Sequence, residues 1–147
     1  MTTASIVYAS MTGNTEQLAE MLREQLEAVG IETNLDECTE VSAEDFSNYD
    51  IAIVATYTYG EGELPDEIVD LYEDLKSTDL AGKIYGVAGS GDRSYADLFC
   101  AAVTQFEDAF EQSGAKKGAN SVKIEFAPDT DEAEEFLAEF VREIASA

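Results

Sequence analysis

Hydrophobic positions along the chain form two kinds of pattern, and the two alternate. Residues 4–9, 50–55 and 83–89 are nearly continuous apolar runs, which predict strands that are covered on both faces. Elsewhere hydrophobic residues recur every three or four positions, which predicts helices with one buried face. These helices are expected over residues 15–29, 66–76, 94–112 and 131–145.

Two details of the helices follow from the same pattern. Gly30 comes directly after the last periodic position of the first helix and is expected to end it. The last helix is expected to bury Phe136, Leu137, Phe140, Val141 and Ile144.

Two further strands show alternation of polar and apolar residues. Residues 31–35 and 122–126 alternate, as strands at the edges of a sheet do. Because strands and helices alternate, the fold class is α/β with a parallel sheet. We predict a doubly wound five-stranded sheet in the order 2-1-3-4-5, with helices on both faces, as a single domain over 1–147. The order 3-2-1-4-5 would place the apolar strand 50–55 at an edge.

Residues 10–15 read Ser-Met-Thr-Gly-Asn-Thr and join the first strand to the first helix. A strand that turns directly into a helix points free backbone N–H groups and the positive helix end at one place, which favours an anion. The segment holds hydroxyls and an amide but no Lys or Arg. We expect a phosphate held by neutral donors. The alternative is a helix cap with spare hydroxyls.

Charge and composition narrow the function further. The 147 residues include 32 Asp and Glu against 8 Lys and Arg, for a formal charge of −24. Such a surface repels nucleic acid and anionic membranes and attracts a basic protein, although solubility or salt tolerance would explain it too. The chain has no histidine, which excludes imidazole catalysis and His metal sites. Cys38 and Cys100 are expected to be buried or idle thiols, because two cysteines give no disulfide framework and no metal-ligand spacing.

Two more segments are expected beside residues 10–15, because the carboxyl ends of neighbouring strands meet at one edge. Residues 56–64 carry Tyr57 and Tyr59 with glycines, and residues 89–98 are rich in small residues and include Tyr95. Each alone is typical of an ordinary turn. Together the three segments predict a phosphate cradle between aromatic walls, which suits a flat ring with a phosphate tail.

With these three segments, the chain resembles the flavodoxin family over nearly all of its length. The segment Ser10 to Thr15 is similar to the family's phosphate signature, and the size is similar to the short-chain group. The resemblance implies non-covalent FMN, with Tyr59 on the inner ring face and Tyr95 on the outer. The implied cofactor-binding residues are Ser10, Met11, Thr12, Gly13, Asn14, Thr15, Thr56, Tyr57, Thr58, Tyr59, Gly60, Glu61, Gly62, Ser90, Gly91, Asp92, Tyr95, Phe99 and Cys100.

Some positions depart from the family pattern. Many relatives have a serine where Tyr57 stands, and Thr56 or Thr58 is the candidate substitute for its phosphate hydroxyl. Many relatives also have Trp or Met at Tyr59. Arg93 has three readings that stay open, as a partner of Asp92, of Asp97 or of the phosphate.

The resemblance implies a one-electron carrier in electron transport, expected to be a monomer with no catalytic or metal-binding residues. The acids given below predict a low second potential, and the lack of a secretory signal and of an apolar run that could span a bilayer predicts a cytoplasmic protein. Its partners would be basic redox proteins, such as a flavodoxin reductase and iron–sulfur acceptors, bound transiently and in a salt-sensitive way. Acids near the expected ring edge support this reading, although a solvated helix face would also explain them. They are Glu61, Glu63, Asp66, Glu67, Asp70, Glu73 and Asp74.

Three alternatives share parts of this pattern. A signalling receiver domain needs an aspartate at the end of the third strand, where this chain has Ala55 and Thr56. A phosphatase or P-loop enzyme needs a cysteine or a Gly-Lys-Ser/Thr that the first segment lacks. A flavodoxin-like FMN protein that acts as a dedicated activator or a reductase would share fold and cofactor, and the sequence does not separate it.

Overall fold

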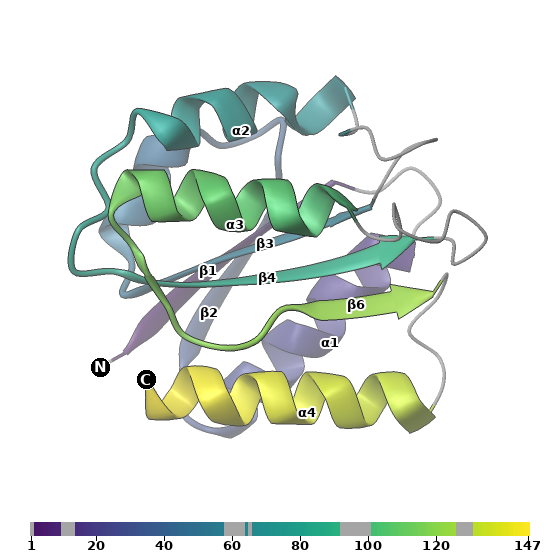
Figure 1. The fold of residues 1–147 in the computed structure, drawn as a ribbon. Helices are drawn as coiled ribbons and strands as arrows, with labels where there is room; N and C mark the ends of the chain where they lie inside the picture. Colours follow the sequence, from purple (N-terminus) through teal and green to yellow (C-terminus); the bar gives the residue numbers. More distant parts are fainter. Residues whose placement is uncertain (1, 10–13, 58–63, 65, 92–100, 126–130) are drawn as a thin grey trace.

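The structure, a computed structural model, describes residues 2–9, 14–57, 64, 66–91, 101–125 and 131–147. A parallel sheet forms the middle layer, with α1 and α4 on one face and α2 and α3 on the other (Figure 1). The strands are β1 (Thr3–Tyr8), β2 (Glu32–Glu37), β3 (Ile51–Tyr57), β4 (Ile84–Gly91), β5 (Lys116–Lys117) and β6 (Val122–Glu125). The helices are α1 (Asn14–Ala28), α2 (Val69–Lys76), α3 (Ala101–Ser113) and α4 (Asp131–Ser146), with short 3₁₀ turns η1 (Ala43–Asn48) and η2 (Asp66–Ile68).

The sheet order is β2-β1-β3-β4-β5, with β6 also paired to β4, and every pairing is parallel. The predicted fold class and order are therefore confirmed. One feature differs: the last position in the sheet is filled by two short strands rather than one. Lys116 pairs with Ile84 at one end of β4, and Val122 pairs with Ala88 toward the other.

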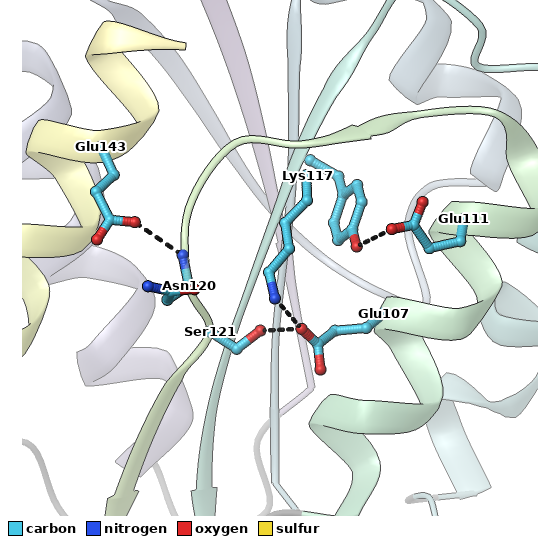
Figure 2. A network of polar contacts seen from close by, with 7 residues as sticks. Glu107, Glu111, Lys117, Asn120, Ser121 and Glu143 are labelled. Atoms are coloured by element: carbon cyan, nitrogen blue, oxygen red, sulfur yellow. Dashed lines mark hydrogen bonds and ion pairs between the residues drawn. The ribbon is translucent and has the colours of Figure 1, made fainter.

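Polar contacts hold the segment between β5 and β6, as Figure 2 shows. Lys117 Nζ lies 3.0 Å from Glu107 Oε2 on α3, and the Ser121 hydroxyl donates to the same oxygen at 2.9 Å. The backbone N–H of Asn120 donates to Glu143 Oε2 on α4 at 2.9 Å. This segment therefore bridges the two helical layers at the edge of the sheet.

Each face of the sheet carries its own hydrophobic core. On one face Leu22 of α1 and Phe140 of α4 are buried against the strands. On the other face Phe106 and Phe110 of α3 are fully buried, and the Phe110 ring stacks on Tyr85 at 4.8 Å between centroids. The sheet is thus covered on both faces, as the apolar runs predict.

Among the described residues, helix ends and faces follow the sequence pattern except at Val29, which is 55% exposed at the end of the first helical pattern, and at Phe136. Gly30 has φ +87° and ends α1 as predicted. In α4, Leu137 and Phe140 are buried, but Phe136 is 40% exposed and the expectation that it is buried is wrong. At 3.6 residues per turn Phe136 lies roughly a quarter turn from the middle of the buried stripe. Of the predicted helix 94–112, residues 94–100 lie outside the described residues.

Candidate functional site

The carboxyl ends of β1, β3 and β4 lie side by side at one edge of the sheet. Tyr8 pairs with Ala55, and Ala55 pairs with Ala88. Beyond the last residue of β1, the Ala9 N–H donates to the Ala55 carbonyl at 3.0 Å. Because the three predicted segments begin where these strands end, the described residues around them meet at this edge, which we call the carboxyl edge.

A buried hydroxyl pair joins the first segment to the third. Thr15, in the first turn of α1, and Ser90, on β4, are 1% and 5% exposed. Their Oγ1 and Oγ atoms lie 3.1 Å apart, and either hydroxyl can be the donor. The helix that begins at Asn14 is thereby bound directly to the strand β4, which ends at Gly91.

Residues at the end of β3 are also engaged. Thr56 is fully buried, and its hydroxyl donates to the carbonyl of Tyr57 at 3.2 Å. The single proton of Thr56 is therefore used locally in this structure. Tyr57 is half-buried, and its hydroxyl donates to Glu67 Oε1 at 3.4 Å. Burial first, and then the charge of Glu67, raises the pKa of Tyr57 to about 12, so this hydroxyl keeps its proton at neutral pH.

Glu67, in η2, links the turn that follows β2 to the end of β3, a role that the sequence pattern does not indicate. Its carbonyl accepts a hydrogen bond from the Cys38 thiol at 3.3 Å, and its carboxylate accepts one from Tyr57. Cys38 is 5% exposed, and burial raises the pKa of its thiol to about 12. The expectation of a buried thiol is confirmed for Cys38. Contacts across 29 residues leave no local signal, so sequence reasoning missed this link.

Exposed acids follow this link along η2 and α2. Asp66, Asp70 and Asp74 are exposed to solvent. The one cation of α2, Lys76, lies 3.6 Å from Glu73 and 4.3 Å from the centroid of the Tyr72 ring. The surface that starts beside the carboxyl edge and runs along η2 and α2 is therefore negative.

A groove lies between α1 and α4, with a volume of about 900 Å³. Its lining includes the carboxylates of Glu24, Asp131, Glu134 and Glu135 and no Lys or Arg. This lining would repel a phosphate, so the groove does not compete with the carboxyl edge as an anion site. Among the described residues no group of three or more Cys, Asp or Glu is placed to hold a metal ion.

Comparisons with known proteins decide the family. A family model described as flavodoxin matches residues 6–140. The chain belongs to the flavodoxin family. A probable flavodoxin 2 of Bacillus subtilis is 41% identical over 141 residues, which cover 95% of this chain and 92% of that protein. The resemblance drawn from residues 10–15 is therefore confirmed.

Solved flavodoxin structures match the whole fold. A flavodoxin of Streptococcus pneumonia TIGR4 is 51% identical, with a TM-score of 0.93 over 98% of each chain. A short-chain flavodoxin described as associated with a non-canonical PDU bacterial microcompartment is 43% identical. It has a TM-score of 0.96 over 99% of this chain and 98% of that one. The prediction of a short-chain member agrees with this match.

In this flavodoxin the predicted cofactor residues divide into two groups. The side chains of Thr15, Thr56, Tyr57 and Ser90 are described and lie at the carboxyl edge. Asn14 is the first residue of α1, and Gly91 is the last of β4. The other predicted residues lie outside the described residues: Ser10, Met11, Thr12, Gly13, Thr58, Tyr59, Gly60, Glu61, Gly62, Asp92, Tyr95, Phe99 and Cys100. Arg93 lies outside them too, and in the part of the chain that is described no helix is long and apolar enough to cross a membrane.

Proposed function

We propose that this chain is a low-potential, one-electron carrier that holds FMN non-covalently and shuttles electrons between redox proteins in the cytoplasm. The observation that supports this most directly is the Thr15–Ser90 pair at the carboxyl edge. It joins the start of α1, where the family's phosphate signature ends, to the end of β4. Family membership supplies the rest of the argument.

The described donors fit a phosphorylated ligand. A buried hydroxyl in the first turn of α1 lies where the backbone N–H groups of a helix are free and the helix dipole is positive. Neutral donors of this kind hold a phosphate without a metal ion. In our proposal Ser10, Thr12, Asn14 and Thr15 hold the phosphate of FMN, and Tyr59 and Tyr95 cover its ring.

Bound FMN supplies the one-electron chemistry, and the protein sets how readily an electron is accepted. In our proposal the peptide that follows Gly60 turns its carbonyl toward the ring, because a glycine adopts positive φ at little cost. The carboxylates on η2 and α2 oppose the addition of negative charge nearby, which lowers the potential for the second electron.

The same carboxylates would attract a basic partner. Exposed Asp66, Asp70 and Asp74 present one sign of charge along η2 and α2, in a row that starts beside the carboxyl edge. Charge complementarity of this kind raises association rates and is weakened by salt. Basic redox proteins, such as a flavodoxin reductase or an iron–sulfur protein, are the partners that this surface suits, in transient complexes with a monomer.

The proposal is tested first on the purified protein. We expect a yellow protein whose flavin is released by mild denaturation, identified as FMN and rebound stoichiometrically. A colourless chain whose refolded form does not bind added FMN would overturn the proposal. Turnover of a quinone or NAD(P)H by the protein alone would instead favour the reductase alternative over a carrier.

The electrostatic part is tested with a charge-neutral triple variant. Asp66→Asn, Asp70→Asn and Asp74→Asn together should raise the second reduction potential and weaken the salt dependence of electron transfer with a basic reductase. The matched control neutralises three exposed acids elsewhere: Glu27, Glu32 and Glu139, each changed to Gln. Equal effects of the two triple variants would show that net charge, rather than position, sets the potential.

A further inference from the structure

The Thr15–Ser90 pair leaves one question of hydrogen-bond direction open, and a ligand would settle it. A hydroxyl has one proton to donate and two lone pairs that accept. In the structure either oxygen can be the donor across the 3.1 Å contact. Both side chains are buried, so solvent does not easily take the place of either partner.

A phosphate group near neutral pH offers only acceptors to a hydroxyl. If Thr15 binds the phosphate of FMN, its single proton must point at a phosphate oxygen. The contact with Ser90 can then persist in one sense only, with Ser90 donating and Thr15 Oγ1 accepting. Hydrogen bonds in such a chain strengthen one another, because an oxygen that accepts becomes a better donor.

We propose that Ser90 is a positioning residue for the phosphate: its hydroxyl donates to Thr15 Oγ1 and thereby fixes the Thr15 proton toward the phosphate. This inference rests on the proposed function. It differs from the role that the family resemblance implies, in which Ser90 belongs to the third segment beside the flavin ring. In our proposal the Ser90 side chain on β4 acts on the phosphate end of FMN, through Thr15 of α1.

The position of Ser90 in the sheet supports a fixed geometry. Ser90 pairs with Tyr57 of β3 on one side and with Ile124 of β6 on the other. A strand that is paired on both sides holds its side chains in a narrow range of positions. Ser90 is therefore better placed than a loop residue to hold the rotamer of Thr15.

The test compares two ligands that differ only in the phosphate. Flavin is removed from wild type and from Ser90→Ala, and each protein is titrated with FMN and with riboflavin by flavin fluorescence. We expect Ser90→Ala to weaken FMN binding about five- to tenfold, the range of one hydrogen bond, and to change riboflavin binding less than about twofold. Ser5→Ala, which changes another buried serine on β1, is the matched control and should leave both affinities unchanged.

Two further variants keep the outcome decisive. In a Thr15→Val background the acceptor is gone, so Ser90→Ala should cause no further loss of FMN affinity relative to riboflavin. If Ser90→Ala does not fold, Ser90→Cys retains the volume with a weak donor and carries the same expectation. Equal weakening of both ligands, or no weakening of FMN, overturns the role of Ser90. If wild type binds no FMN, the proposed function fails instead.

Discussion

Two polar links in this molecule each join segments that are distant in the sequence, and they are built in opposite ways. At the carboxyl edge, Thr15 and Ser90 form a neutral, buried pair. At the β5–β6 edge, Lys117 and Ser121 share the Glu107 carboxylate, and the Lys117 and Glu107 side chains are 41% and 21% exposed (Figure 2). The first link uses only short side chains without charge, and the second is built around a long charged pair, Lys117 and Glu107.

The two links differ in how much hydrogen-bonding capacity they leave for a ligand. A partly exposed ion pair can complete its remaining hydrogen bonds with water, and salt screens it. A buried hydroxyl pair uses part of its hydrogen-bonding capacity and retains acceptors or a proton for something else. The carboxyl edge is therefore the region whose remaining hydrogen-bonding groups can bind a ligand.

The largest expected effect concerns Cys38 near the carboxyl edge. Burial raises the pKa of its thiol to about 12, so little reactive thiolate forms near pH 8. Alkylation with iodoacetamide, followed by peptide-resolved mass spectrometry, should leave Cys38 unmodified in the folded protein. In urea the same cysteine should react at the rate of a free thiol. Rapid modification of the folded protein would show that the carboxyl edge opens readily.

Gly89→Ala should destabilise the fold next most strongly. A Cβ at Gly89 would lie 2.3 Å from Val103 Cγ2 of α3, too close for any side chain. We expect a loss of about 2–3 kcal/mol in the free energy of unfolding, measured with urea.

Relief of the contact provides the control for Gly89. Val103→Ala removes the atom that clashes, so adding it to Gly89→Ala should cost less than the sum of the two single changes. Strict additivity would mean that β4 shifts away from α3 instead and that the carboxyl edge is not rigid.

Glu67→Gln should lower the pKa of Tyr57 from about 12 by up to roughly one unit, because burial remains and the carboxylate charge is removed. A tyrosine whose pKa is raised by folding stabilises the fold fully below pH 10 and loses this contribution as pH rises through about 12. In the variant, the stabilising contribution of Tyr57 should therefore be lost at a lower pH than in wild type. Ultraviolet titration of tyrosinate measures the shift, with exposed Glu44→Gln as the control. An unchanged pKa would show that the 3.4 Å contact carries no weight.

Lys117→Met should have the smallest effect. Because the pair with Glu107 is partly exposed, we expect a loss of about 0.5 kcal/mol that disappears in 1 M salt. Lys116→Met, at a neighbouring exposed lysine with no ion pair to the described residues, is the matched control. A large loss of stability that persists in 1 M salt would show that the Lys117–Glu107 pair behaves as a buried link, like the Thr15–Ser90 pair.

Most of the fold could be predicted because its signals are local. Apolar runs such as 50–55 mark strands covered on both faces, and Gly30 marks a helix end through its positive φ. The split of the last strand could not be predicted, because Lys116 and Lys117 are polar and pair with β4 through their backbone alone. The prediction that Phe136 is buried was wrong, because the spacing of hydrophobic residues gives the direction of the buried helix face but not its width.

The candidate site was predictable only in part, for a related reason. The signature over 10–15 is contiguous, so its residue types and the strand before it can be recognised together. The contact between Thr15 and Ser90 joins residues 75 positions apart, and the link between Cys38 and Glu67 joins residues 29 apart. Contacts of this kind exist only when the sheet has brought its strands into register, and no local pattern encodes them.

The order of the strands along the chain also determines when the site can form during synthesis on the ribosome. Thr15 leaves the ribosome early, but Ser90 lies on the fourth strand to be made and follows it 75 residues later. Domains fold as units during translation, so a nascent chain that ends before β4 has the signature but not the partner that would hold it. Capture of the cofactor is then an event of the nearly finished chain, and ligand present at that moment would stabilise the newly closed sheet by mass action.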